Sequence, residues 1–199
     1  DCLYKDISGP DGTPDGVVDA YDQVVLGSGL PKVNFGLSTH MEYKGFDLNI
    51  STYGVLNYHV SDDIYNSLNS CYGYGNKEVG MLDANRWSED GSTYLSNVPR
   101  TYAANNATLA WNDLFSSRKI QNAAYWKIAN VELGYNFPDK WFGGYVSGVR
   151  LYVSAQNLYT FTGYHGYNVD YAGGTFTPGY NFCSFPSART FMAGLHFTF

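Results

Sequence analysis

The sequence has little charge, little cysteine and no long apolar run. Lys, Arg, Asp and Glu together make up 15% of the 199 residues, whereas a soluble domain usually has about a quarter. The net charge is −6, and no Lys/Arg cluster is present, so we do not expect the chain to bind nucleic acid. No apolar stretch is long enough for a transmembrane helix, and residues 1–30 are acidic and Gly-rich rather than patterned as a signal peptide.

Catalytic and metal-binding motifs are also scarce. The three cysteines, Cys2, Cys71 and Cys183, form no CxxC pair, so we do not expect a zinc site. The four histidines are scattered, and the HExxH, GxSxG and P-loop patterns are missing. We therefore expect no catalytic residues and no enzyme activity.

Aromatic residues and glycine are abundant instead. The chain has 19 Tyr, 12 Phe, 4 Trp and 22 Gly. Tyr and Trp combine an apolar body with a polar tip, which suits the boundary between a membrane and water. This composition favours antiparallel β-structure at such a boundary.

Period-two alternation is the main structural signal, and it predicts an all-β chain with five long strands. The stretches that alternate are 32–44, 46–58, 126–137, 146–161 and 190–199. In the last of them, one face carries Phe191, Ala193, Leu195, Phe197 and Phe199, and the other carries Thr190, Met192, Gly194, His196 and Thr198. Such strands have the length that crosses a membrane.

Charge is segregated between the two faces of these strands. The predicted apolar faces carry no charge except Lys127, near a strand end, whereas Glu42, Asp47, Glu132 and Arg150 lie on the opposite faces. A charge that faces lipid at mid-membrane costs about 2–4 kcal/mol, so a membrane barrel requires this segregation. Aromatic residues gather near the short turns and would form a girdle at the membrane surface. A soluble β-sandwich also has alternating strands and remains an alternative.

Five strands cannot close a membrane barrel, because the smallest have about eight and open edges are not tolerated in lipid. We therefore expect residues 32–199 to be the last five antiparallel strands of a larger barrel, with long extracellular loops at 59–122 and 162–189. Glu132, Arg150, Tyr152 and Gln156 would face the lumen. A small barrel with a structural or adhesive role would need several chains.

Residues 1–31 are expected to form an extracellular acidic loop, and residues 11–22 read DGTPDGVVDAYD. An EF-hand-like loop takes its ligands from positions 1, 3, 5, 7, 9 and 12 and has Gly at position 6. Gly16 occupies the sixth position. Oxygen ligands at this spacing suit a structural Ca²⁺. An ordinary solvated acidic turn is the alternative. The ligand positions are Asp11, Thr13, Asp15, Val17 (through its carbonyl), Asp19 and Asp22.

The long loops are rich in Tyr, Trp, Asn and Gly, which are common in adaptable recognition surfaces. Their aromatic side chains could stack on sugar rings, pack on peptides, dock a partner protein or pack loop against loop. The candidates for contact with a substrate or partner are Trp87, Trp111, Tyr164, Tyr167 and Tyr171.

Several stretches, in this order and spacing, resemble one family. They are residues 11–51, which run from the acidic loop to YKGFDLNIS; NRWSEDGSTYLSNVPR (85–100); SSRKIQNAAYWKIANVELGYNFP (116–138); VRLYVSAQNLYTFTGYHGYNVD (149–170); and FPSARTFMAGLHFTF (185–199). Together they resemble the C-terminal portion of a SusC/RagA-type TonB-linked outer-membrane transporter. GYNVD replaces the family's usual G-x-D-P-E, and Thr13 replaces its usual Asn.

The resemblance implies a barrel of about 22 strands, located in the bacterial outer membrane, that imports glycans or peptides. It also implies an N-terminal plug and further strands, a SusD-like surface lipoprotein and the TonB–ExbB–ExbD energy complex as partners. Phe199 would serve as the signal for barrel assembly. On this interpretation the final strand is the true end of the protein, and a cut in an extracellular loop would explain a start at Asp1. The alternative function is a soluble Ca²⁺-dependent carbohydrate-binding β-sandwich module.

Overall fold

A computed structural model describes residues 2–71, 75–82, 86–87, 98–101, 112, 114–142, 147–170, 174 and 176–198. The chain divides into two compact units. One contains residues 1–27 and 61–120, and the other contains residues 28–60 and 121–199. Each unit is described by itself below.

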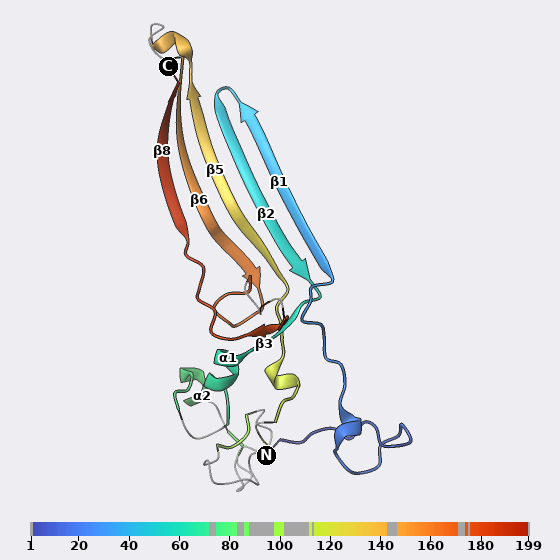
Figure 1. Cartoon of the computed structure of the whole chain (residues 1–199). Coiled ribbons are helices and arrows are strands. Elements are labelled where there is room, and N and C mark those ends of the chain that lie inside the picture. Colours follow the sequence, from blue (N-terminus) through green and yellow to red (C-terminus); the bar gives the residue numbers. More distant parts are fainter. Residues whose placement is uncertain are drawn as a thin grey trace. The chain divides into compact units, whose positions relative to one another are not determined.

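The second unit is built on a five-stranded antiparallel sheet (Figure 1). Its spatial order is β1-β2-β5-β6-β8. The strands are β1 (Val33–Tyr43), β2 (Phe46–Leu56), β5 (Tyr125–Phe137), β6 (Gly148–Thr162) and β8 (Thr190–Thr198). The five predicted strands are therefore confirmed, with ends that move by a few residues.

The strand register places apolar residues beside apolar residues, and polar residues beside polar or small ones, across all five strands. One row of paired residues runs Met41, Leu48, Leu133, Val153 and Ala193, and the next row runs Glu42, Asp47, Gly134, Tyr152 and Gly194. Since neighbouring residues of a strand point to opposite faces, the first row lies on an apolar face and the second on a polar face. The predicted segregation of the faces is confirmed along these rows.

A two-residue turn joins β1 to β2. Lys44 has φ of 49° and Gly45 has φ of 90°, and positive φ at both central residues is the signature of a type I′ hairpin turn. This turn matches the twist of the flanking strands and fixes their register. The link from β5 to β6 is also short and includes the 3₁₀ helix η4 (Asp139–Trp141).

A β-bulge corrects one sequence-based prediction, the placement of Lys127 on the apolar face. The pairing of β5 with β2 and β6 shifts between Ile128 and Asn130, which leaves Ala129 outside the ladder. An extra residue in one strand moves every side chain beyond it to the opposite face of the sheet. Lys127 therefore pairs with Tyr53 on the polar face, while Trp126 pairs with Phe161 on the apolar face.

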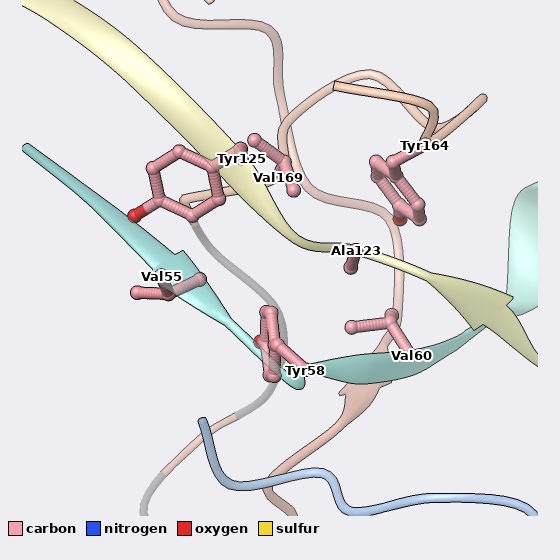
Figure 2. Packing of buried hydrophobic residues seen from close by; sticks show 7 residues of the cluster. All are labelled: Val55, Tyr58, Val60, Ala123, Tyr125, Tyr164 and Val169. Carbon is pink, nitrogen blue, oxygen red and sulfur yellow. The ribbon is translucent and has the colours of Figure 1, made fainter. Parts of the chain in front are cut away.

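The loops beyond the bulge contain structure of their own, whereas the alternation pattern predicts only a long loop for residues 59–122. The short strands β3 (His59–Asp62), β4 (Gln121–Asn122) and β7 (Tyr180–Asn181) form a second sheet in the order β4-β3-β7. A buried apolar cluster lies beside it in the second unit, as Figure 2 shows. The cluster contains Val55, Tyr58, Val60, Ala123, Tyr125, Tyr164 and Val169.

The first unit contains short helices. They are the 3₁₀ helix η1 (Ala20–Asp22), α1 (Asp63–Leu68), α2 (Val79–Leu82) and the 3₁₀ helix η3 (Ser117–Lys119). The Asp62 side chain accepts the backbone N–H of Tyr65 and so caps α1. Among the described residues, no helix has the length and apolar character needed to cross a membrane.

Candidate functional site

A charged network on the polar face is the most developed polar site of the sheet. Arg150 of β6 donates from Nε to Asp47 Oδ2 of β2 at 3.0 Å and from Nη2 to Glu132 Oε1 of β5 at 2.7 Å. Asn136 donates from Nδ2 to the same Asp47 oxygen at 3.0 Å. Three adjacent strands therefore meet in one network, whose bidentate Arg–carboxylate contact is a strong and directional kind of ion pair.

Because Asp47 is buried, the charged residues of the network depend on one another for their partners. Only 4% of the Asp47 surface is exposed, and a buried carboxylate without partners would be costly. The network passes over Gly134, where an added Cβ would lie 2.5 Å from Asp47 Oδ2 and 2.6 Å from Arg150 Nη2. Glycine at this position leaves room for the Arg150 side chain to reach Asp47.

The four predicted lumen-facing residues lie on one face, as the sequence indicated, but they do not all touch. Glu132 and Arg150 form an ion pair, and the Arg150 guanidinium lies 5.2 Å from the centroid of the Tyr152 ring. Gln156 is exposed and pairs in register with Asn130 and Thr190. Asp47, which binds Arg150 most closely, is not among the residues that the sequence predicts to line the lumen. Its place on the polar face was the only signal for it in the sequence.

A second ion pair ties a loop to the polar face. Lys127 of β5 forms an ion pair with Asp170 of the segment between β6 and β8, and the Tyr53 hydroxyl donates to Asp170 Oδ2 at 3.1 Å. The Lys127 side chain is 5% exposed. Sequence reasoning missed this cluster because it joins residues far apart in the chain and depends on the bulge at Ala129.

The aromatic candidates have different surroundings. Tyr164 is 6% exposed within the buried cluster and Tyr167 is 61% exposed, so only Tyr167 of these two offers a large free surface. Arg100 lies over the Trp87 ring at 5.4 Å, which is the geometry of a cation–π contact. Trp111, Tyr171 and Phe199 lie outside the described residues.

The carboxylates of the acidic loop are engaged by backbone amides. Asp22 Oδ1 accepts the N–H groups of Ile7 at 2.6 Å and Ser8 at 3.1 Å, and Asp22 Oδ2 accepts that of Asp19 at 2.8 Å. Hydrogen bonds from the Ile7, Asp19 and Ser8 amides lower the pKa of Asp22, because they favour its charged form. Asp15, Asp19 and Asp6 likewise accept the amides of Val17, Tyr21 and Gly16.

Within the described part of the chain, no three His, Cys, Asp or Glu side chains form a group that could hold a metal ion. The loop in this conformation uses its carboxylates as caps for its own turns. The predicted ligand set stays a prediction. It consists of Asp11, Thr13, Asp15, Val17, Asp19 and Asp22. An ion would have to compete with the backbone amides for the carboxylates of Asp15, Asp19 and Asp22.

Aromatic rings gather at the short-turn end of the sheet. Phe46 packs on Tyr135 at 4.6 Å between ring centroids, Tyr135 on Phe137 at 4.9 Å, and Phe137 on Trp141 at 5.9 Å. A continuous row of aromatic rings where strands end is typical of the girdles of outer-membrane proteins.

Comparison with known proteins shows which sequences and structures this chain resembles. No family model matches the sequence. TonB-dependent receptor P3 of Formosa agariphila is 29% identical over 205 residues, which cover 99% of this chain and 19% of the relative. TonB-dependent receptor SusC of Bacteroides thetaiotaomicron is 26% identical over 191 residues, which cover 95% of this chain and 17% of the relative. The chain is homologous to one portion of SusC-like TonB-dependent receptors.

Solved structures give the same fold. The RagAB peptide transporter matches with a TM-score of 0.77 at 22% identity, over 98% of this chain and 20% of that chain. The RagAB peptide importer in its closed-closed state matches with a TM-score of 0.76 at 23% identity. The chain thus spans about a fifth of the length of the relatives and solved structures that it matches. Those relatives are receptors and transporters, in agreement with the expectation that it is not an enzyme.

Proposed function

We propose that this chain forms the last five strands of the wall of a SusC-like, TonB-dependent transporter in the bacterial outer membrane, which imports glycans or oligopeptides. The observation that carries the proposal is a sheet with one uncharged apolar face and one charged polar face. In a barrel wall the apolar face contacts lipid and the polar face lines the lumen. The homology to TonB-dependent receptors over nearly the whole chain supports the same function.

The two edges of the sheet have a place in this proposal. β1 and β8 each have one partner among the described strands, and an open strand edge is not tolerated within lipid. We propose that preceding strands of the same protein pair with β1, that the first strand pairs with β8, and that about 22 strands close the wall.

The polar network has a role in this arrangement. It contains two carboxylates and one guanidinium, so it presents net negative charge to the lumen. Within the proposed transporter, Glu132, Arg150, Tyr152 and Gln156 face the plug or the passing substrate. A SusD-like surface lipoprotein captures the substrate, and TonB–ExbB–ExbD drives its release past the plug.

The test uses the full-length protein in a bacterium that carries it. We expect the protein to sediment with the outer membrane, to remain there in alkaline carbonate and to dissolve only in detergent. Uptake of a labelled oligosaccharide or oligopeptide should then be lost when TonB is deleted. A protein recovered folded in the detergent-free soluble fraction would contradict the proposal and would favour the soluble carbohydrate-binding module.

The structure gives that alternative module little support. A β-sandwich needs a second sheet over its apolar face. The only other sheet in the described part of the chain consists of three strands with two to four residues each. Leu37, Val153, Phe191 and Leu195 of the apolar face are each at least half exposed.

We also propose that the acidic loop binds Ca²⁺ weakly through the six ligand positions named above. The spacing of its oxygen ligands supports this proposal. Calcium should raise the thermal stability of the full-length protein, and Asp15→Asn should abolish the increase while Asp63→Asn, which lies outside the loop, preserves it. An identical melting temperature with calcium and with chelator would sink the idea.

A further inference from the structure

Two cysteines far apart in the chain meet at one guanidinium group in the first unit. Arg118 Nη1 lies 3.7 Å from Cys71 Sγ and 3.9 Å from Cys2 Sγ. The two sulfur atoms are therefore separated by no more than the sum of these two distances. These two residues are 69 positions apart and form no CxxC motif, so no pattern in the sequence pairs them.

The surroundings hold both thiols in place. Asn112, which is 3% exposed, accepts the Cys2 backbone N–H on Oδ1 at 2.8 Å, and its backbone carbonyl accepts the Cys2 thiol at 3.6 Å. Cys71 is completely buried, whereas Cys2 is half-buried. One thiol is thus reachable from solvent and the other is shielded behind it.

The position of the guanidinium favours thiol–disulfide chemistry over metal binding. The thiolate is the nucleophile in disulfide exchange, and a guanidinium at this distance can donate hydrogen bonds to it. The positive charge of the guanidinium repels a metal cation, and two sulfur atoms are fewer ligands than a closed soft-metal site requires.

We propose that Cys2 and Cys71 are the two halves of a disulfide bond that forms by exchange with an external disulfide. The Cys2 thiolate attacks a sulfur atom of the external disulfide, forms a mixed disulfide and releases one thiolate. The Cys71 thiolate then attacks Cys2 Sγ, forms the Cys2–Cys71 bond and releases the second thiolate. The external disulfide takes up two electrons, and the two protons of the cysteines end on the released thiols.

Closure requires the two sulfur atoms, which both lie beside Arg118 Nη1, to approach bonding distance, because a disulfide brings the two Cβ atoms to about 3.5–4.5 Å. The bond would fasten the segment that precedes residues 11–22 to the segment that follows α1, within the same unit. This inference does not depend on transport, so it can fail or succeed independently of the proposed function.

The experiment uses the full-length protein in detergent, incubated with oxidised glutathione. Free thiols are then blocked with N-ethylmaleimide under denaturing conditions, so that buried cysteines also react, and unreduced peptides are analysed by mass spectrometry. We expect one linked pair of peptides that contains Cys2 and Cys71, and its disappearance after reduction.

Three variants serve as controls. Cys183→Ser should leave the linked pair unchanged, because Cys183 is exposed and lies in the other unit. Cys2→Ser should abolish it, and Arg118→Gln should slow its formation at least about threefold, because the reacting sulfur atoms lose their hydrogen-bond donor. If Cys2 and Cys71 both carry N-ethylmaleimide after oxidation, or if Cys183 links to either of them as readily, the proposal is wrong.

Discussion

Asp47 lies on the polar face with 4% of its surface exposed, and it accepts hydrogen bonds from Arg150 and Asn136. Replacing it with alanine leaves Arg150 without its main counter-charge in the interior of the network. We expect Asp47→Ala to lower the free energy of unfolding by about 3 kcal/mol, as when one partner of a buried ion pair is removed. Urea unfolding of the full-length protein in detergent measures this change.

A matched control for Asp47 lies directly opposite it on the neighbouring strand. Glu42 pairs in register with Asp47, but its side chain is 71% exposed, with Oε1 3.0 Å from His40 Nε2. Glu42→Ala should therefore cost no more than about 1 kcal/mol. Equal effects of the two substitutions would contradict the role assigned to the network.

Asp22 gives the acidic loop a dependence on pH. Its pKa is lowered in the folded chain by hydrogen bonds from Ile7, Asp19 and Ser8. A carboxyl group of this kind stabilises the fold above its unfolded pKa of about 3.9, and that contribution is lost as the pH falls through the lower, folded value. The turn that Asp22 stabilises should therefore stay folded at pH 5 and above and should lose this stabilisation in stronger acid.

Hydrogen exchange tests this prediction for the acidic loop. After correction for intrinsic rates, the amides of Ile7 and Ser8 should be protected at pH 6, and this protection should be lost in Asp22→Ala, which removes the accepting oxygen. Asp11→Ala is the control, because Asp11 accepts neither of these amides in the structure. Undiminished protection in Asp22→Ala would show that the carboxylate does not hold the turn.

Substitutions on the two faces of a single strand can test which face of the sheet contacts lipid. Ala155 and Gln156 are neighbours on β6, so they lie at nearly the same depth but on opposite faces. Ala155→Lys places a charge against lipid, at a cost of about 2–4 kcal/mol near the midplane, and Gln156→Lys places it in the lumen. Quantitative blotting of outer-membrane fractions should show a large loss for Ala155→Lys and nearly wild-type levels for Gln156→Lys; the reverse order would mean that the faces are assigned wrongly.

The ion pair between Lys127 and Asp170 connects a strand to a loop. Lys127→Met or Asp170→Asn alone leaves a partner buried without its counter-charge, and each should cost about 3 kcal/mol. The double variant removes both charges and should cost clearly less than the sum. Thermal unfolding of the four proteins gives this coupling, and additive losses would mean that the pair does not hold the loop.

Local alternation was enough to predict the five strands and their two faces. It could not predict the bulge at Ala129, because one extra residue changes the facing of the strand without changing the composition of the sequence. The prediction therefore placed Lys127 on the wrong face and missed its pairing with Asp170.

Long-range contacts limited the prediction of the site in the same way. Arg150 was recognised from its place on the polar face, but its partner Asp47 lies two strands away in the sheet and more than a hundred residues away in sequence. Alternation assigns a residue to a face and says nothing about which residue of another strand it meets. Cys2, Cys71 and Arg118 were missed for this reason too.

At the scale of the whole molecule, a sheet with one apolar face and two open edges is stable in a membrane only as part of a closed wall. The charge pattern, the aromatic row and the homology to SusC-like receptors all agree with this arrangement. The apolar face then needs no covering sheet, because lipid covers it.

The structure of the full-length protein in detergent, determined by electron cryomicroscopy, tests this arrangement most directly. We expect β1, β2, β5, β6 and β8 to be consecutive in a barrel wall, with Leu133, Val153 and Phe191 against the detergent belt and Asp47 and Arg150 in the lumen. A map in which a second sheet packs on Leu133 and Val153, or in which β1 or β8 keeps an open edge, would contradict the proposed arrangement.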